Sequence, residues 1–324
     1  PRFNGRSKFQ EKAVWVKLTT ENFPRLVSVR GHNGLTDEAG WCGPFNGRDE
    51  AQRAIEALYE VTQLRQCTPR ISLRSMKSAS PCALFDMKKC GAPCVGKESI
   101  DSYSSHVLSV QFALHHDATS VITQLHQRMK MLADNERFEE AAEIRNRLGA
   151  FIRGSARGQR IRSLTRVPHL IAALPISPAR WEFVVIRHGR LAGSAQATSS
   201  THKEVIESLT LTAEVVNENE GILPASSHEE VEVLLRYLNQ DGIRIVEMEG
   251  EWSSPVFGSV RLVTNLRKLE KPQNHFATRK ILLIRLIDLP NVPPTEQQHH
   301  CQPPVSPTHI RWPVVALHQD WYPL

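Results

Sequence analysis

Four cysteines in one stretch of the chain are the residues best suited to chemistry. They are separated by 14, 7 and 3 residues and comprise Cys67, Cys82, Cys90 and Cys94. Four thiolates can close a tetrahedral zinc site or hold an iron–sulfur cluster. Lys88 and Lys89 would offset part of their negative charge. A zinc ribbon uses close Cys-x2-Cys pairs, which this spacing lacks. The pattern predicts a metal site and leaves the metal open.

Disulfides and simple packing are the alternatives for these thiols. Six cysteines in 324 residues are too few for a disulfide scaffold, and a reducing cytosol would keep them as thiols. Cysteine also packs as a small hydrophobe, but residues 67–97 are polar and show no apolar period, which argues against a packed core. Cys42 stands apart in a Gly-rich stretch, where we expect a packed thiol.

The charge of the chain is concentrated in its first half. Residues 1–166 hold 26 Lys and Arg against 17 Asp and Glu, whereas residues 167–324 hold 14 against 17. Basic side chains release counterions from a phosphate backbone, so the first half is expected to bind a polyanion. A solvated basic surface is the alternative. The sequence has no run of 18 apolar residues and no apolar signal segment at its start, so we expect a cytoplasmic protein without a membrane partner.

The elements that must position the cysteines lie on both sides of them. Alternating apolar residues predict two strands within 12–30, and the stretch "GHNGLTDEAGWCGPF" is expected to be a loop. Apolar residues at spacings of three and four predict an amphipathic helix over 47–64. No period survives between Cys67 and Lys97, as in a loop segment that a metal holds together, and helix is expected again over 100–117.

A helical hairpin is predicted over residues 118–154. Two apolar stripes are separated by the polar stretch "ADNER", which favours an antiparallel turn. Ala141 and Ala142 would let the helices approach closely, and Phe138 would anchor an exposed apolar face. A hairpin that packs only on its own chain is the alternative. The basic stretch 155–167 is expected to be a linker.

The second half predicts a small domain and a tail. Residues 168–264 indicate two or three strands, two helices and a last strand, and Ser227 followed by Glu230 matches a capping box. Residues 265–324 hold nine of the 20 prolines and five of the 14 histidines, and most of this segment is expected to be disordered. A metal role for His299, His300 and Cys301 is not favoured. The fold class predicted for the whole chain is α+β and multidomain.

Three quoted stretches, taken in order, carry a resemblance to a known family. "GWCGPFNGRDEAQRAIEALYEVTQLRQC", "PCALFDMKKCGAPCVG" and "RFEEAAEIRNRL" resemble the middle of UvrC, the incision subunit of bacterial nucleotide excision repair. In that family a GIY-YIG nuclease domain precedes a four-cysteine region and the UVR helical hairpin. The chain is also similar to actinobacterial UvrC-like proteins in which a DnaQ-type exonuclease precedes the GIY-YIG module. Residues 156–264 resemble the carboxyl-terminal region of those fusions.

The resemblance implies a role for each segment. Residues 1–66 would be the end of the GIY-YIG-like α/β module with its following helix, and 67–117 the cysteine region, which would hold a 4Fe-4S cluster, with zinc as the alternative. Arg25 and Arg30, near the stretch "FPRL", would contact DNA phosphates together with Lys88 and Lys89. The UVR hairpin would dock on UvrB through Phe138, Glu139, Ala141, Ala142 and Arg145.

Catalysis is expected to be incomplete in this chain. The stretch "PRFN" places Asn4 at the active-site asparagine of the family, while the family's tyrosines, arginine and metal-binding glutamate would precede Pro1. Mg or Mn would be needed only with that upstream domain. The expected function is therefore DNA and UvrB binding in excision repair. A McsA-like regulatory adaptor, which would carry paired Cys-x2-Cys motifs, and a decayed gene product are the alternatives.

Overall fold

The computed structural model describes residues 13–31, 35, 40–72, 80–216, 221–223, 225–253 and 259. Within this part of the chain, helices pack around two antiparallel sheets, which gives a mixed α/β architecture. Asn4, the expected tail over 265–324 and the three residues His299, His300 and Cys301 lie outside the described residues.

The first sheet is built from three short strands. β1 (Val14–Leu18), β2 (Leu26–Arg30) and β3 (Trp41–Phe45) lie in the order β2-β1-β3, and both pairings are antiparallel. β1 and β2 are the two strands that alternation predicted. The loop expected over "GWCGPF" was wrong, because β3 is a fully buried edge strand. Pro44 cannot donate to a ladder, but an edge strand tolerates that loss.

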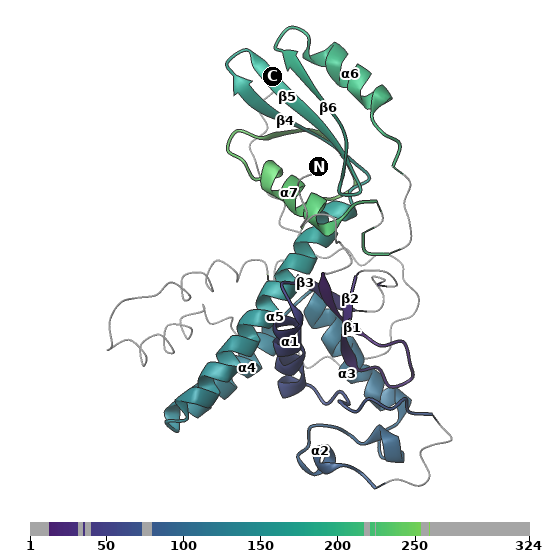
Figure 1. Cartoon of the computed structure of the whole chain (residues 1–324), viewed down its shortest axis with the longest axis vertical. Helices are drawn as coiled ribbons and strands as arrows, with labels where there is room; N and C mark the ends of the chain where they lie inside the picture. The colour runs from purple at the N-terminus through teal and green to yellow at the C-terminus, as the bar shows by residue number, and fades with distance from the viewer. Residues whose placement is uncertain are drawn as a thin grey trace, which may run out of the picture.

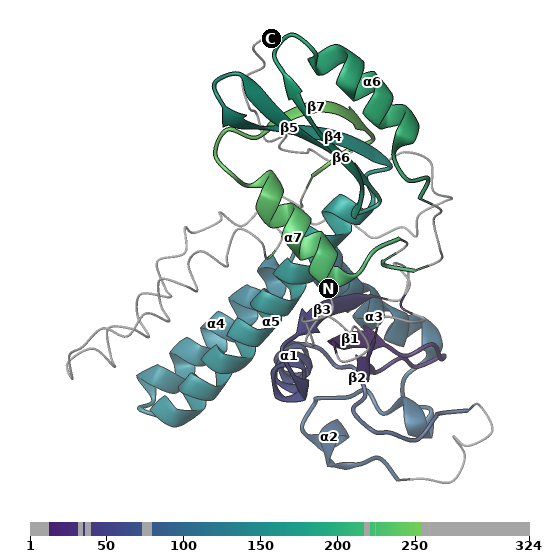
Figure 2. The same ribbon diagram turned by 45° about the horizontal axis from the view of Figure 1, so that its top comes forward.

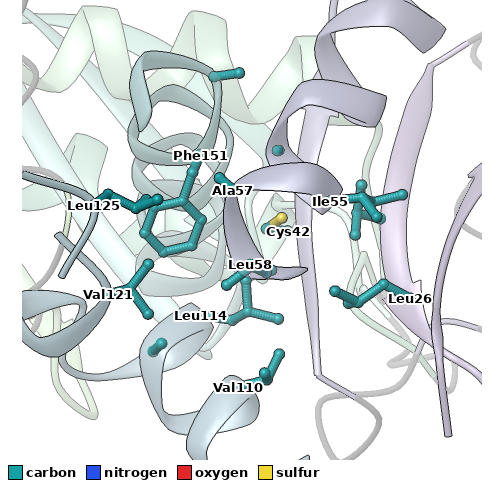
Figure 3. Close-up of a cluster of buried hydrophobic side chains, with 14 of the residues drawn as sticks. Leu26, Cys42, Ile55, Ala57, Leu58, Val110, Leu114, Val121, Leu125 and Phe151 are labelled. Atoms are coloured by element: carbon teal, nitrogen blue, oxygen red, sulfur yellow. The ribbon is translucent and has the colours of Figure 1, made fainter. Parts of the chain in front are cut away.

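One buried cluster fills the space between this sheet and the helices around it. α1 (Arg48–Val61) and α3 (Ile100–His115) are the helices expected on either side of the cysteine segment. Figure 3 shows side chains from β2, β3, α1, α3 and two further helices converging in this cluster. The thiol of Cys42 lies among them, and burial raises its pKa, so it is a packed thiol as predicted.

The predicted helical hairpin is present, but its second helix does not end where expected. α4 (Thr119–Asp134) and α5 (Phe138–Thr165) pack against each other. α5 continues for 28 residues and carries the chain from the hairpin to the second sheet (Figure 1). Nearly all of the stretch 155–167, which was expected to be a linker, is helix with a largely buried face.

Close contact between α5 and β3 explains the linker-like sequence. A Cβ atom added at Gly154 would overlap the ring of Phe45, and one at Gly158 would stand 3.0 Å from the ring of Trp41. A glycine inside a helix costs about 1 kcal/mol relative to alanine, so it lowers the helical signal in a sequence. Here the missing side chains let the helix axis pass directly over the strand.

The second sheet lies between two helices. β4 (His169–Ser177), β5 (Arg180–Arg187), β6 (Arg190–Thr198) and β7 (Arg244–Glu249) are antiparallel neighbours in the order β6-β5-β4-β7. α6 (His202–Thr212) packs on one face and α7 (His228–Leu238) on the other (Figure 2). The strands and helices predicted within 168–250 are therefore present.

The capping box predicted for α7 is half formed. The Ser227 hydroxyl accepts a hydrogen bond from the backbone N–H of Glu230 at 3.1 Å, as a cap should. The Glu230 carboxylate does not return to the cap. It accepts instead from the backbone N–H of Leu191 at 3.0 Å, which ties α7 to the start of β6.

The two halves of the described chain share a buried cluster. Trp15 of β1 meets Trp41 of β3 edge to face at 5.4 Å, and both belong to the cluster that contains Leu170 of β4 and Val231 of α7. No helix among the described residues is long and apolar enough to span a membrane.

Candidate metal centre and docking surfaces

The cysteine segment is an irregular loop between α1 and α3. Its regular structure consists of α2 (Ala83–Asp86) and a short 3-10 turn (Pro93–Val95). Figure 2 shows α2 in a loop at one side of the first sheet. Lys88 and Ala92 adopt positive φ angles of 56° and 57°, which side-chain-bearing residues seldom do. The segment therefore holds a tight shape with little core of its own.

Two of the four predicted cysteines have thiol pKa values that the other cysteines influence. Burial raises the pKa of the Cys90 thiol, and the Cys67, Cys82 and Cys94 thiols raise it further. Burial also raises the pKa of Cys94, again with a contribution from Cys67 and Cys82. Like charges raise one another's pKa, so Cys67 and Cys82 act electrostatically on the two later cysteines.

The four thiols do not form a closed ligand shell. Among the described residues, no three His, Cys, Asp or Glu side chains form a ready-made metal site. The five described cysteines, Cys42 included, are free. A set of four sulfurs is nevertheless the chemistry that zinc and iron–sulfur clusters prefer. Metal binding and local folding are coupled in such segments, so a bound ion would draw the sulfurs together.

Several contacts fasten this loop to α1. The ammonium group of Lys89 lies 3.5 Å from the Glu60 carboxylate, and the Gln63 amide donates to the backbone carbonyl of Lys88 at 3.1 Å. Lys89 is therefore engaged with an acid, whereas the side chain of Lys88 is exposed. Of the two predicted lysines, Lys88 is the one presented to solvent.

Sequence reasoning missed Arg65, which holds the start of the segment. Its side chain is fully buried, forms an ion pair with Glu21 at 2.7 Å and donates to the carbonyls of Phe23, Cys67 and Pro69. Arginine is usually exposed, so the residue type did not indicate that this side chain would be buried. The only sequence signal was its position between apolar Leu64 and Cys67.

The two arginines predicted to contact DNA do not form one patch. Arg25 is half-buried just before β2, and its charge lowers the pKa of Tyr59, whose pKa burial raises overall. Arg30 is exposed at the other end of β2. Arg30 and Lys88 are therefore the better exposed of the predicted basic residues.

Two arginines in the middle of α5 form ion pairs with neighbouring helices. Arg153 meets Glu50 of α1 at 2.8 Å, and Arg157 meets Glu232 of α7 at 2.7 Å. These ion pairs hold α5 against its neighbours and remove charge from the surface available to a polyanion. The net charge of the first half thus overstates its basic surface.

The turn of the hairpin presents an apolar tip. Phe138 opens α5 with its side chain 41% exposed, and Met131 near the end of α4 is 53% exposed. Glu139 is exposed beside them, while Ala142 and Arg145 are half-buried. Ala141 is buried inside the hairpin and packs the two helices rather than facing a partner. Met131 could have been recognised as exposed from the sequence, because it is an apolar residue outside the periodic apolar stripe of α4.

Two known families match consecutive parts of the chain. Residues 13–113 match the family described as "UvrC/Cho excinuclease, middle domain", and residues 119–151 match the "UvrB/uvrC motif". The first match covers the first sheet, α1, the cysteine segment and most of α3. The second covers α4 and the first half of α5.

Curated relatives show a similar pattern. A bifunctional exonuclease/endonuclease protein of Mycobacterium tuberculosis is 30% identical over 256 residues, which cover 78% of this chain and 38% of that protein. UvrABC system protein C of Carboxydothermus hydrogenoformans is 28% identical over 209 residues, 64% of this chain and 34% of the relative. The corresponding protein of Rickettsia prowazekii is 32% identical over 151 residues, 46% of this chain and 23% of the relative.

The chain spans between 23% and 38% of the length of these three relatives. The alignments of 256 and 209 residues are longer than residues 1–151, so they extend beyond the hairpin toward the second sheet. No solved structure matches the chain.

Proposed function

Residues 13–151 belong to the UvrC family, and from that premise we propose that the chain acts in nucleotide excision repair as a DNA-binding and UvrB-docking part of an incision protein. The observation that carries this proposal is the unbroken order of matches, from the middle domain through the UVR motif. A McsA-like adaptor would account for the hairpin but not for the middle-domain match over 13–113, which includes β1 and β2.

The metal part of the proposal concerns the four cysteines. Cys67, Cys82, Cys90 and Cys94 would hold a 4Fe-4S cluster, with zinc as the alternative. The bound group would supply cross-linking of a segment that has little core of its own. The electrostatic influence of Cys67, Cys82 and Cys94 on Cys90 supports this proposal, and Lys88, which is exposed, would offset part of the negative charge.

The docking part of the proposal concerns the hairpin tip. Phe138 and Met131 offer an exposed apolar surface next to the charged Glu139, and Ala142 and Arg145 extend it along α5. Exposed aromatic and apolar side chains of this kind commonly anchor the helices of a partner protein. The equivalent hairpin of UvrB is the proposed partner.

The nucleic-acid part of the proposal is limited to binding. Arg30 and Lys88 would neutralise phosphates without reading base sequence, and Arg25 and Lys89 would contribute where their present contacts allow. Cleavage by a GIY-YIG centre would need a set of residues of which Asn4 is the only one assigned in this chain.

Calorimetric titration of the chain with UvrB from the same organism tests the proposal. The wild-type chain should bind, and Phe138→Ala should weaken binding by about 2 kcal/mol or roughly 30-fold, as expected for a central apolar anchor. Phe112→Ala is the matched control, because Phe112 is 48% exposed on α3, outside the hairpin. Equal loss in both variants, or no binding by the folded wild type, would reject the proposal.

A further inference from the structure

The side chain of Arg65 connects two segments that the chain must hold together. It is fully buried between the turn that joins β1 to β2 and the first residues of the cysteine segment. Removing a guanidinium from water is costly unless acceptors surround it. The arrangement of those acceptors therefore indicates what Arg65 is placed to do.

One side of the guanidinium is anchored on the first sheet. An ion pair at 2.7 Å joins it to Glu21, whose side chain is also largely buried, and its Nε donates to the carbonyl of Phe23 at 2.7 Å. Glu21 also accepts a hydrogen bond from the hydroxyl of Thr19. The hydrogen bond from Thr19 holds the Glu21 carboxylate in position, and the carboxylate holds the Arg65 guanidinium in position.

The other side of the guanidinium faces the first cysteine. Its Nη1 donates to the carbonyl of Cys67 at 2.6 Å and to that of Pro69 at 2.9 Å. The same nitrogen lies 3.4 Å from the sulfur of Cys67, within hydrogen-bonding range for sulfur. Burial lowers the pKa of Arg65, but the hydrogen bond to Cys67 and the Glu21 carboxylate outweigh that effect and raise it. The group is charged.

We infer that Arg65 is a positioning residue for the four-cysteine site: it fixes the Cys67 sulfur against the first sheet and gives that sulfur a charged hydrogen-bond donor. The inference rests on the proposed metal site. Cys82, Cys90 and Cys94 lie within 13 residues of one another in the chain, whereas Cys67 precedes Cys82 by 15 residues. Cys67 therefore needs its own anchor, and Arg65 provides it.

The chain offers a control that disturbs the same buried region without touching the sulfur. The hydroxyl of Tyr103 accepts from the backbone N–H of Arg65 at 2.9 Å and donates to the carbonyl of Pro24 at 2.6 Å. Tyr103→Phe removes both hydrogen bonds and leaves the guanidinium in contact with Cys67. Arg65→Lys keeps the positive charge but removes the planar guanidinium group, whose nitrogens contact Cys67 and Glu21 at the same time.

Zinc serves as the probe. The full metal-free chain is titrated with Zn²⁺ against a competing chelator, with folding of each variant checked by circular dichroism. Arg65→Lys should bind zinc about 10- to 100-fold more weakly than wild type, the usual effect of removing a residue that supports a metal ligand. Tyr103→Phe should lower the melting temperature and leave zinc affinity unchanged. Should Arg65→Lys not fold, Glu21→Gln replaces it, and a loss of zinc affinity is again expected.

A second readout separates ligand tuning from general stability. In chain reconstituted with iron and sulfide, the reduction potential of Arg65→Lys should shift to more negative values, because a hydrogen bond to a ligand sulfur is lost. Tyr103→Phe should leave the potential in place. Wild-type zinc affinity together with a wild-type potential in Arg65→Lys would overturn the inference while leaving the metal site standing.

Failure of the proposed metal site has a different signature. If wild-type chain binds neither zinc nor iron, the metal proposal fails, and amide hydrogen exchange in the metal-free chain tests the positioning claim. Exchange over residues 67–71 should be faster in Arg65→Lys than in Tyr103→Phe, because only the former releases the carbonyls of Cys67 and Pro69. Equal exchange in the two variants would overturn that claim.

Discussion

At the scale of single residues, the cysteines of the proposed metal site and the buried Arg65 are the groups whose charges interact most closely. Burial raises the pKa of Cys90 and that of Cys94, and the other cysteines of the set raise both further. These two thiols therefore favour their neutral form in the absence of a bound metal cation. Nearby, buried Arg65 is compensated by Glu21 and by backbone carbonyls. The two features adjoin at Cys67.

Replacement of the most buried of the four cysteines tests the metal site. Cys90→Ser should abolish most binding of iron or zinc and increase proteolysis within residues 67–97, because ligation and local folding are coupled. Metal analysis of anaerobically purified protein and limited proteolysis measure the two effects. The control is Cys42→Ala, which removes a packed thiol outside the cluster and should leave metal content unchanged. Equal metal content in Cys90→Ser and wild type would contradict the assignment.

At the scale of elements, α5 is the part that organises the others. Its first half pairs with α4, its middle passes over β3 at Gly154 and Gly158, and its end packs with α7. Ion pairs from Arg153 to Glu50 and from Arg157 to Glu232 fix its rotation. The helix thus sets where the hairpin tip stands relative to both sheets.

Two glycines of α5 should respond in opposite ways to alanine. At Gly154 the new methyl group would overlap the buried ring of Phe45, so Gly154→Ala should lower the free energy of unfolding by about 1–3 kcal/mol. At Gly149 it would meet only the flexible end of Arg153, so Gly149→Ala should be neutral or stabilising by up to about 1 kcal/mol. Urea denaturation measures both, and the same sign for the two would contradict the packing described.

A half-buried histidine makes α4 sensitive to acid. Burial and the charge of Lys130 lower the pKa of His126 from its ordinary 6.5, and its Nε2 is buried without a hydrogen-bond partner among the described residues. The folded state therefore resists a proton that the unfolded state accepts, so this contribution is complete above pH 6.5 and is lost as pH falls.

Thermal unfolding at pH values from 7.5 to about 5 measures this acid sensitivity. The melting temperature should fall over that range, and His126→Gln should flatten the dependence. His116, whose pKa is lowered by burial and by Arg162 and Arg166, acts in the same direction, so some slope should remain. If the melting temperature of His126→Gln depended on pH as steeply as that of wild type, His126 would not contribute to the acid sensitivity.

The periodic elements could be predicted from the sequence, and the exceptions share a physical cause. α1, the hairpin and β4 to β7 follow apolar periods because each buries one face. β3 and the end of α5 escaped prediction because glycine and proline there serve a close contact between distant segments, which a local pattern does not reveal. The buried role of Arg65 could not be predicted, since its acceptors come from two stretches that are more than 40 residues apart in the chain, Phe23 in one and Cys67 with Pro69 in the other.

On the scale of the whole molecule, a shared buried cluster joins the two sheets through the end of α5. Trp15 and Trp41 on one side and Leu170 and Val231 on the other belong to it. The hairpin tip, by contrast, projects away from both sheets in Figures 1 and 2. A body that holds the basic and cysteine-rich surfaces, with a projecting tip that is free to dock, suits a protein that meets DNA and a partner at once.

Salt dependence tests the proposed DNA surface. Affinity for double-stranded DNA should fall steeply with salt, and Arg30→Ala should reduce the slope of log affinity against log salt concentration by about 1. Arg153→Ala is the control, because Arg153 pairs with Glu50 and is not proposed to meet a phosphate. Fluorescence anisotropy at several salt concentrations measures the slopes. An unchanged slope in Arg30→Ala would exclude this residue from the surface.

Assembly on DNA is the most direct test of the central claim, that this chain binds UvrB and DNA in excision repair. The measurement is a gel mobility shift with UvrB preloaded on lesion-bearing duplex DNA, to which the chain is then added. A further-shifted ternary complex is expected with wild-type chain and with Phe112→Ala, and its loss is expected with Phe138→Ala. Absence of a ternary complex with folded, metal-loaded wild-type chain, or its persistence with Phe138→Ala, would contradict the account.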